Sequence, residues 1–171
     1  MKLKLFYLLI ALVGGFTFVS CDDDDDAPKL KDIPQACLDS FKAKFPEAKN
    51  VDWERKGTYY VAEYDKFNNR EVEVSAWFAP DGTWNMTDTD YGKDLFMLPT
   101  EINTAFNQSE YSSWTIDDID LYEYPDTTKD FYLIEVEKAG QTDMELYFKT
   151  DGTLIKAIPD TNTDITPDTQ I

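Results

Sequence analysis

Carboxylates are the only abundant reactive groups in this chain. Its 171 residues include 34 aspartates and glutamates, 16 lysines and arginines, and no histidine. Without histidine the chain lacks the commonest general base, the usual partner of serine and cysteine nucleophiles, and the commonest zinc ligand. The formal net charge of -18 also argues against nucleic-acid binding, because affinity for phosphates depends on lysine and arginine. Histidine-dependent enzymes and nucleic-acid-binding proteins are therefore disfavoured classes.

The acidic residues could form a metal site or a catalytic pair. Asp160, Asn162 and Asp164 have the spacing that opens a calcium-binding loop. However, Ile165 stands where that loop needs glycine, and Ile171 stands where it needs glutamate. Close acidic pairs arise by chance in so acidic a chain, and nothing in the sequence supplies the cleft of a glycosidase. We therefore predict no metal, no cofactor and no enzymatic activity, with a carboxylate-based hydrolase as the less favoured alternative.

The two cysteines have different expected roles. Cys21 follows Phe18-Val19-Ser20, and together these residues resemble a bacterial lipobox. By that resemblance Cys21 would become the N-terminus and carry the lipid. The alternative is an ordinary signal peptide with an incidental cysteine. Cys37 lies on the apolar stripe of an expected helix, where a small core residue is favoured over a nucleophile.

The first 20 residues predict export. Two lysines precede an almost wholly apolar run from Leu5 to Val13, which is the pattern of a secretory signal peptide. The run is shorter than the roughly 20 residues that cross a bilayer, so a transmembrane anchor is the less favoured alternative. Residues 21–29 include five consecutive aspartates and are expected to form a solvated acidic tether. We predict a lipid-anchored protein of the bacterial envelope, at the outer membrane or the cell surface.

Two segments of the chain repeat each other. Residues 33–45 read IPQACLDSFKAKF, and residues 98–110 read LPTEINTAFNQSE. In both, a proline opens an apolar i, i+4, i+8 stripe that is typical of a short amphipathic helix. Further along, Asp81-Gly82-Thr83 corresponds to Asp151-Gly152-Thr153, and aspartate-glycine is a strong hairpin signal. We infer the duplication of one unit.

Each unit is predicted to be one helix followed by four strands. The expected strands lie near 50–55, 58–65, 70–79 and 83–89 in the first unit and near 114–123, 130–138, 142–149 and 153–158 in the second. The succession of hairpins predicts one antiparallel sheet. The expected fold class is α+β, with two tandem helix-plus-four-strand repeats at 30–92 and 93–160, both helices on one face of the sheet, and a polar tail at 161–171.

Alternation along the strands divides the side chains between two faces. The apolar set of the third strand is Val72, Val74, Ala76 and Phe78, and we expect it to lie under the helices. The opposite set is mostly acidic but carries Trp77, with Tyr147 at the equivalent position of the second unit. The predicted partner-binding residues are Trp53, Trp77, Trp84 and Tyr147. Tryptophan and tyrosine are enriched at interface hot spots; the alternative is that these rings pack against each other and stiffen the sheet.

Residues 30–160 resemble the PepSY-like family of secreted bacterial proteins, whose fold is similar to that of the beta-lactamase inhibitor protein. The resemblance rests on the two proline-led helices, the aromatic strands Tyr59–Tyr64 and Phe131–Val136, and the two Asp-Gly-Thr turns. It implies tandem helix-plus-sheet repeats, fits a lipoprotein signal and brings no catalytic residues.

The expected function is a non-catalytic protein-binding module, with enzyme inhibition as one specific form. A structural or accessory periplasmic protein is the alternative. The acidic surface predicts a protein partner with a basic surface, and the lipid anchor predicts contact with a membrane.

Overall fold

The structure, a computed structural model, describes residues 32–68, 70–161 and 164–169. The predicted signal peptide at 1–20, the predicted lipidation site Cys21 and the tether at 21–29 lie outside the described residues. Within the described ranges, no helix is long and apolar enough to cross a membrane.

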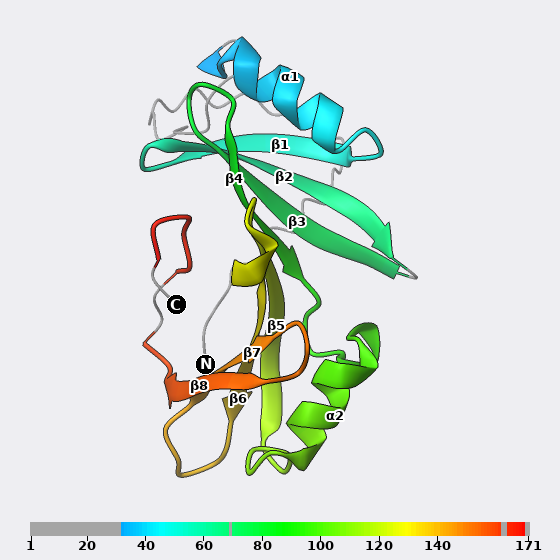
Figure 1. The fold of residues 1–171 in the computed structure, drawn as a ribbon, viewed down its shortest axis with the longest axis vertical. Helices are drawn as coiled ribbons and strands as arrows, with labels where there is room; N and C mark the ends of the chain where they lie inside the picture. Colours follow the sequence, from blue (N-terminus) through cyan, green and yellow to red (C-terminus); the bar gives the residue numbers. More distant parts are fainter. Residues whose placement is uncertain (1–31, 69, 162–163, 170–171) are drawn as a thin grey trace, which may run out of the picture.

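Eight antiparallel strands form one sheet, and each strand pairs with the next along the chain (Figure 1). The strands are β1 (Lys49–Lys56), β2 (Tyr59–Asn68), β3 (Arg70–Phe78), β4 (Trp84–Asp90), β5 (Thr115–Glu123), β6 (Phe131–Glu137), β7 (Met144–Lys149) and β8 (Leu154–Pro159). Helix α1 (Gln35–Lys44) precedes β1, and helix α2 (Thr100–Gln108) lies between β4 and β5. Two 3-10 turns, η2 (Leu95–Met97) and η3 (Thr127–Lys129), interrupt the connections. The α+β class and the antiparallel sheet with two helices are confirmed.

Both α-helices begin directly after a proline. The sequence predicts these prolines at the first helical position, but Pro34 and Pro99 are the N-caps of α1 and α2, so each helix begins one residue later. Their ψ angles of 134° and 150° are extended rather than helical. The prolines therefore lead the chain into each helix, and the helical backbone begins at the next residue.

The two Asp-Gly-Thr turns connect β3 to β4 and β7 to β8. In each turn the aspartate Oδ1 accepts a hydrogen bond of 2.9 Å from the threonine N–H two residues later. Gly82 and Gly152 have φ angles of 84° and 86°, where a side chain would be strained. A Cβ atom on Gly82 would lie 2.6 Å from the Ala36 oxygen of α1, and one on Gly152 would lie 2.8 Å from the Glu101 oxygen of α2. Glycine thus allows each turn to approach the start of a helix.

Side chains from the sheet enter two separate buried clusters. The first, here called the helix-side cluster, includes Cys37 and Phe41 of α1 and Ile102 and Phe106 of α2. Its strand residues include Ala62, Tyr64, Val74, Ala76, Phe78, Ile119, Ile134, Leu146 and Phe148. Cys37 is fully buried, and burial raises the pKa of its thiol. This environment is that of a core residue.

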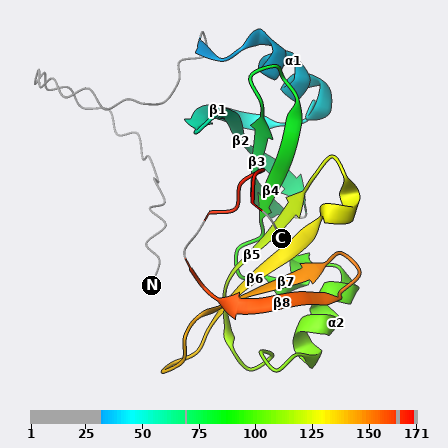
Figure 2. The same ribbon diagram turned by 60° about the vertical axis from the view of Figure 1, so that its left-hand side comes forward.

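The second cluster, here called the tail-side cluster, is built from the alternate strand residues. Its members are Val61, Trp77, Met86, Tyr122, Phe131, Leu133, Tyr147 and Ile165. Ile165 belongs to the C-terminal segment 164–169, which runs back from the end of β8 toward the middle of the molecule (Figure 2). The side of the sheet that carries this cluster is called the tail-side face below.

Candidate functional site

A cavity of about 760 Å³ opens on the tail-side face, beside the C-terminal segment. The turn between β1 and β2 forms one part of its wall, and residues 164–168 form another. The strand residues that line it are Trp77, Asp88, Asp120, Tyr122, Leu133 and Glu135. The cavity therefore combines apolar rings with acidic side chains.

The sheet register places the apolar residues of this face in adjacent rows. Trp77 pairs with Val61 of β2 and with Met86 of β4. Phe131 is stacked on Tyr122, with 4.9 Å between the ring centroids and 19° between the planes. Offset or tilted ring pairs of this kind add to the stability that area burial provides. The apolar centre of the face is therefore well packed.

Acidic side chains surround this apolar centre. Burial, followed by the charges of Asp88 and Asp120, raises the pKa of Tyr122. The Tyr147 hydroxyl donates a hydrogen bond of 2.7 Å to Glu145 Oε2. Burial and this hydrogen bond raise the pKa of Tyr147. Acidic side chains thus lie close to Tyr122 and Tyr147, and Lys156 Nζ lies 4.3 Å from the centroid of the Tyr147 ring.

A lysine between two glutamates lies at the β1–β2 edge of the cavity. Lys56 Nζ contacts Glu54 Oε1 and lies 3.4 Å from Glu63 Oε1. The same ammonium lies 5.5 Å from the centroid of the Trp77 ring. Burial, followed by the hydrogen bond and charge of Glu54, raises the pKa of Glu63 to about 7, although Lys56 acts in the opposite direction. This edge therefore contains a carboxyl group that titrates near neutral pH.

The C-terminal segment reaches this face through one apolar and one polar contact. Ile165 is 9% exposed and belongs to the tail-side cluster. The Tyr59 hydroxyl donates a hydrogen bond of 3.0 Å to Asp168 Oδ1. The sequence predicts a polar tail at 161–171, and it gave no signal that the one apolar residue of the described segment is buried. A single isoleucine has no periodic neighbours that could reveal its environment.

The four predicted partner-binding residues divide between the two sides of the sheet. Trp77 and Tyr147 lie in the tail-side cluster, at 6% and 3% exposure. Trp53 and Trp84 pack against the helix-side cluster instead. Trp53 pairs with Ala62, and a β-bulge after Trp77 brings Trp84 opposite Phe78. Paired residues lie on the same face of the sheet, and Ala62 and Phe78 belong to the helix-side cluster. Both tryptophan rings therefore lie on the helix side.

Trp53 and Trp84 both contact α1. The Trp53 ring lies 5.5 Å from the ring of Phe41, edge to face. Lys44 Nζ lies 3.5 Å from the Trp84 ring, whose Nε1 donates a hydrogen bond of 2.9 Å to Thr87 Oγ1. Trp84 also lines a second hollow of about 800 Å³, between the end of α1 and β2.

Sequence reasoning missed several residues that line the tail-side cavity. They are Lys56, Tyr59, Tyr122 and Leu133. Of these, Tyr122 depends on the pairing of β4 with β5, which places it opposite Asp88. These two strands are connected through α2 and not by a tight turn, so the sequence has no hairpin motif that predicts their pairing. The alternation of Asp118, Asp120 and Tyr122 was the available clue.

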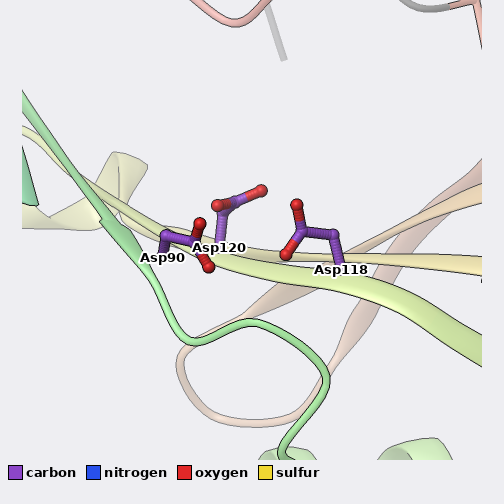
Figure 3. Close-up of side chains that lie close together, drawn as sticks. All are labelled: Asp90, Asp118 and Asp120. Carbon is purple, nitrogen blue, oxygen red and sulfur yellow. The ribbon is translucent and has the colours of Figure 1, made fainter. Parts of the chain in front are cut away.

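Three aspartates form the one group among the described residues whose spacing suits a metal ion. Oxygen atoms of Asp90, Asp118 and Asp120 lie within 4.8 Å of one another (Figure 3). Each of these residues has further interactions within the protein, and Asp118 Oδ1 accepts a hydrogen bond of 3.0 Å from the Ile119 N–H. Calcium takes six to eight oxygen ligands, more than these side chains provide. The Asp160–Asp164 spacing, which was not favoured as a calcium loop, lies partly outside the described residues.

Comparison with known proteins agrees with this architecture. The chain matches the family described as "Putative beta-lactamase-inhibitor-like, PepSY-like" over residues 25–75 and 66–156. Among curated proteins, none matches the chain.

Solved structures from Bacteroides species are similar to this chain. A BLIP-like protein from Bacteroides fragilis NCTC 9343 is 34% identical, with a TM-score of 0.68, and the match covers 80% of this chain and 91% of that one. A DUF2874 family protein from Bacteroides ovatus ATCC 8483 is 26% identical, with a TM-score of 0.66 and coverage of 74% and 86%. A structure described as "putative periplasmic proteins" from Bacteroides eggerthii DSM 20697 is also 26% identical, with a TM-score of 0.65 and coverage of 75% and 90%.

The family match extends over both helices and seven of the eight strands in full, and the first of these structures shares more than three tenths of its residues over most of the chain. The chain therefore belongs to the PepSY-like, beta-lactamase-inhibitor-like family.

Proposed function

We propose that this protein is a non-catalytic protein-binding module of the bacterial envelope and that it binds its partner through the tail-side face. The observation that carries the proposal is the construction of this face. An apolar, aromatic centre is ringed by acidic side chains, and it already accommodates the C-terminal segment 164–169. A face that seats one peptide segment has the shape and chemistry to seat another.

The aromatic residues support a binding role for this face. Trp77 and Tyr147 belong to the tail-side cluster, as does Ile165. Large aromatic side chains supply much of the binding energy of protein interfaces. Trp53 and Trp84 pack toward α1, and their binding role stays a prediction.

We also propose that the two halves are copies of one unit, with both helices covering the same face. The proline N-caps, the matching Asp-Gly-Thr turns and the contributions of both helices to the helix-side cluster support this. Under this arrangement the helices leave the tail-side face free for a partner. Inhibition of an envelope enzyme is the specific form suggested by the description of the Bacteroides fragilis protein as BLIP-like.

We also propose that the protein is exported from the cytoplasm and is anchored to the envelope by a lipid on Cys21. The periplasmic description of one similar structure supports export. Labelling cells with a palmitate analogue tests the anchor. We expect the label on the wild-type protein and none after Cys21→Ser; label on the variant would contradict the anchor.

The binding proposal is tested by crosslinking and affinity capture from native envelope, with the lipidated protein as bait. We expect the double variant Asp88→Asn, Glu135→Gln to capture at least about 10-fold less partner at low salt, because it removes two charges from the proposed interface.

The matched control is Glu47→Gln, Glu101→Gln, which removes the same charge from exposed positions outside the tail-side cavity. Full capture by the first variant, or an equal loss in the control, would overturn the proposal, provided that circular dichroism shows both variants to be folded.

A further inference from the structure

The tail-side cavity is lined in part by a short segment of this same chain. Residues 164, 165, 166 and 168 all contribute to its wall. Ile165 inserts into the tail-side cluster, beside residues that the β-strands provide. The segment therefore occupies the surface that the proposed function assigns to a partner.

The segment forms a turn that is closed by hydrogen bonds of its own. The Thr166 N–H donates to Thr169 Oγ1 at 2.9 Å, and the Thr169 N–H donates to the Thr166 oxygen at 2.9 Å. These bonds lie within the segment itself. The buried Ile165 side chain and the exposed Tyr59–Asp168 hydrogen bond tie it to the face. A competing segment that supplies an aliphatic side chain can take over the apolar contact.

The charges of the segment do not match the charges of the cavity. Asp164 and Asp168 belong to the same cavity wall as Asp88, Asp120 and Glu135 of the sheet. Among the described residues of that wall, Lys56 is the one cation, and it already contacts Glu54 and lies near Glu63. Like charges repel. The burial of Ile165 must therefore offset the repulsion between the aspartates of the segment and the acidic side chains of the sheet.

We propose that residues 164–169 are a built-in occupant of the tail-side face beside the cavity, and that the partner segment that replaces them carries an aliphatic anchor flanked by lysine or arginine. This inference rests on the proposed function, since it names the chemistry of the partner for the same face. A basic segment would keep the apolar contact and exchange charge repulsion for attraction.

Two labelled peptides test the inference by fluorescence anisotropy against the full chain. One has the sequence of residues 164–169, and the other is its Asp164→Lys, Asp168→Lys analogue. We expect the lysine analogue to bind the Ile165→Ala protein at least about 10-fold more tightly than the native peptide, and at least about 10-fold more tightly than it binds the wild type.

Salt separates this electrostatic account from a purely apolar one. Raising salt from about 50 mM to about 500 mM should weaken binding of the lysine analogue to the protein, because screening removes attraction between partly exposed charges. It should strengthen docking of the native segment, because the same screening removes repulsion. A peptide with Ile165→Asp should not bind at all.

A second variant keeps the test decisive if Ile165→Ala destabilises the protein. Tyr59→Phe removes only the hydroxyl that contacts Asp168. The Tyr59→Phe protein should bind the lysine analogue about 3-fold more tightly than the wild-type protein does. Equal binding of the analogue to wild type and both variants would overturn the inference, as would tighter binding of the native peptide. Concentration-dependent dimerisation that blocks peptide binding would also overturn it, because residues 164–169 of a second copy would then cover the tail-side face.

The inference and the proposed function fail in different ways. Equal envelope capture by wild type and Ile165→Ala, with capture lost in Asp88→Asn, Glu135→Gln, would refute the built-in occupant and leave the binding function standing. Selective peptide binding without any envelope capture would support the built-in occupant and refute the proposed function.

Discussion

The two sides of this sheet are both apolar at the centre, yet they are covered in different ways. Two helices contribute Cys37, Phe41, Ile102 and Phe106 to the helix-side cluster. A short C-terminal segment contributes the single residue Ile165 to the tail-side cluster, and acidic side chains line the cavity beside it. Extensive burial under helices stabilises a fold, whereas a cover anchored by one side chain can be exchanged. The comparison separates the side that holds the protein together from the side suited to binding.

The largest expected effect comes from the helix-side cluster. Phe106 is 2% exposed, so Phe106→Ala should lower the free energy of unfolding by about 3–5 kcal/mol through lost burial and a residual cavity. Urea denaturation measures this. The matched control is Phe96→Ala, at a residue 94% exposed, which should change stability by less than about 0.5 kcal/mol. Similar losses in the two variants would contradict the distinction.

A glycine against α2 should give the next largest effect. Gly152→Ala places a Cβ atom 2.8 Å from the Glu101 oxygen at a φ angle of 86°, and we expect a loss of about 2–3 kcal/mol from strain and displacement of the turn. Gly140 also has a positive φ, of 78°, but no atom within 4 Å of its would-be Cβ. Gly140→Ala should therefore cost about 1 kcal/mol. Equal losses in thermal or urea unfolding would refute the close approach of turn and helix.

Loss of the Ile165 contact in the C-terminal segment should lower stability less than Phe106→Ala or Gly152→Ala does. Ile165→Ala should lower the free energy of unfolding by about 1–2 kcal/mol, because a site at the surface relaxes more easily than a core site. Native-state hydrogen exchange should show faster exchange in residues 164–169 with little change in α2. Equal acceleration in α2 would mean that the segment belongs to the structural core.

The smallest effect concerns pH. The pKa of Glu63 is raised to about 7, so the folded state binds this proton more tightly than the unfolded state. The resulting stability is fully present below the unfolded pKa of about 4.3 and is lost as pH rises through about 7. Glu63→Gln should make stability less dependent on pH between about 4 and 7, by about 1 kcal/mol after allowance for partial exposure of the group. An unchanged pH profile would show that Glu63 does not titrate in this range.

Much of the fold could be predicted from the sequence because its signals are local. The Asp-Gly-Thr turns and the period-2 alternation give strand boundaries that differ from the structure by only a few residues, for example 83–89 against the observed Trp84–Asp90. The proline-led segments likewise predict both helices. Turn chemistry and alternation act within a few residues, so one sequence suffices to detect them.

The site was less predictable because it depends on contacts between distant residues. The bulge after Trp77 moves Trp84 to the helix side, and alternation alone cannot show a bulge. The Tyr59–Asp168 hydrogen bond joins the start of the sheet to the end of the chain. No spacing in the sequence announces such a contact, so the cover over the tail-side cavity could be found only in the structure.

Hydrogen exchange of the full chain, with and without the lysine analogue of residues 164–169, tests the central claim most directly. The account predicts slower exchange at the β1–β2 turn, around residues 56–59, together with faster exchange in residues 164–169 as they are displaced. Slower exchange confined to α1 or α2, or no change at residues 164–169 at saturating peptide, would contradict it.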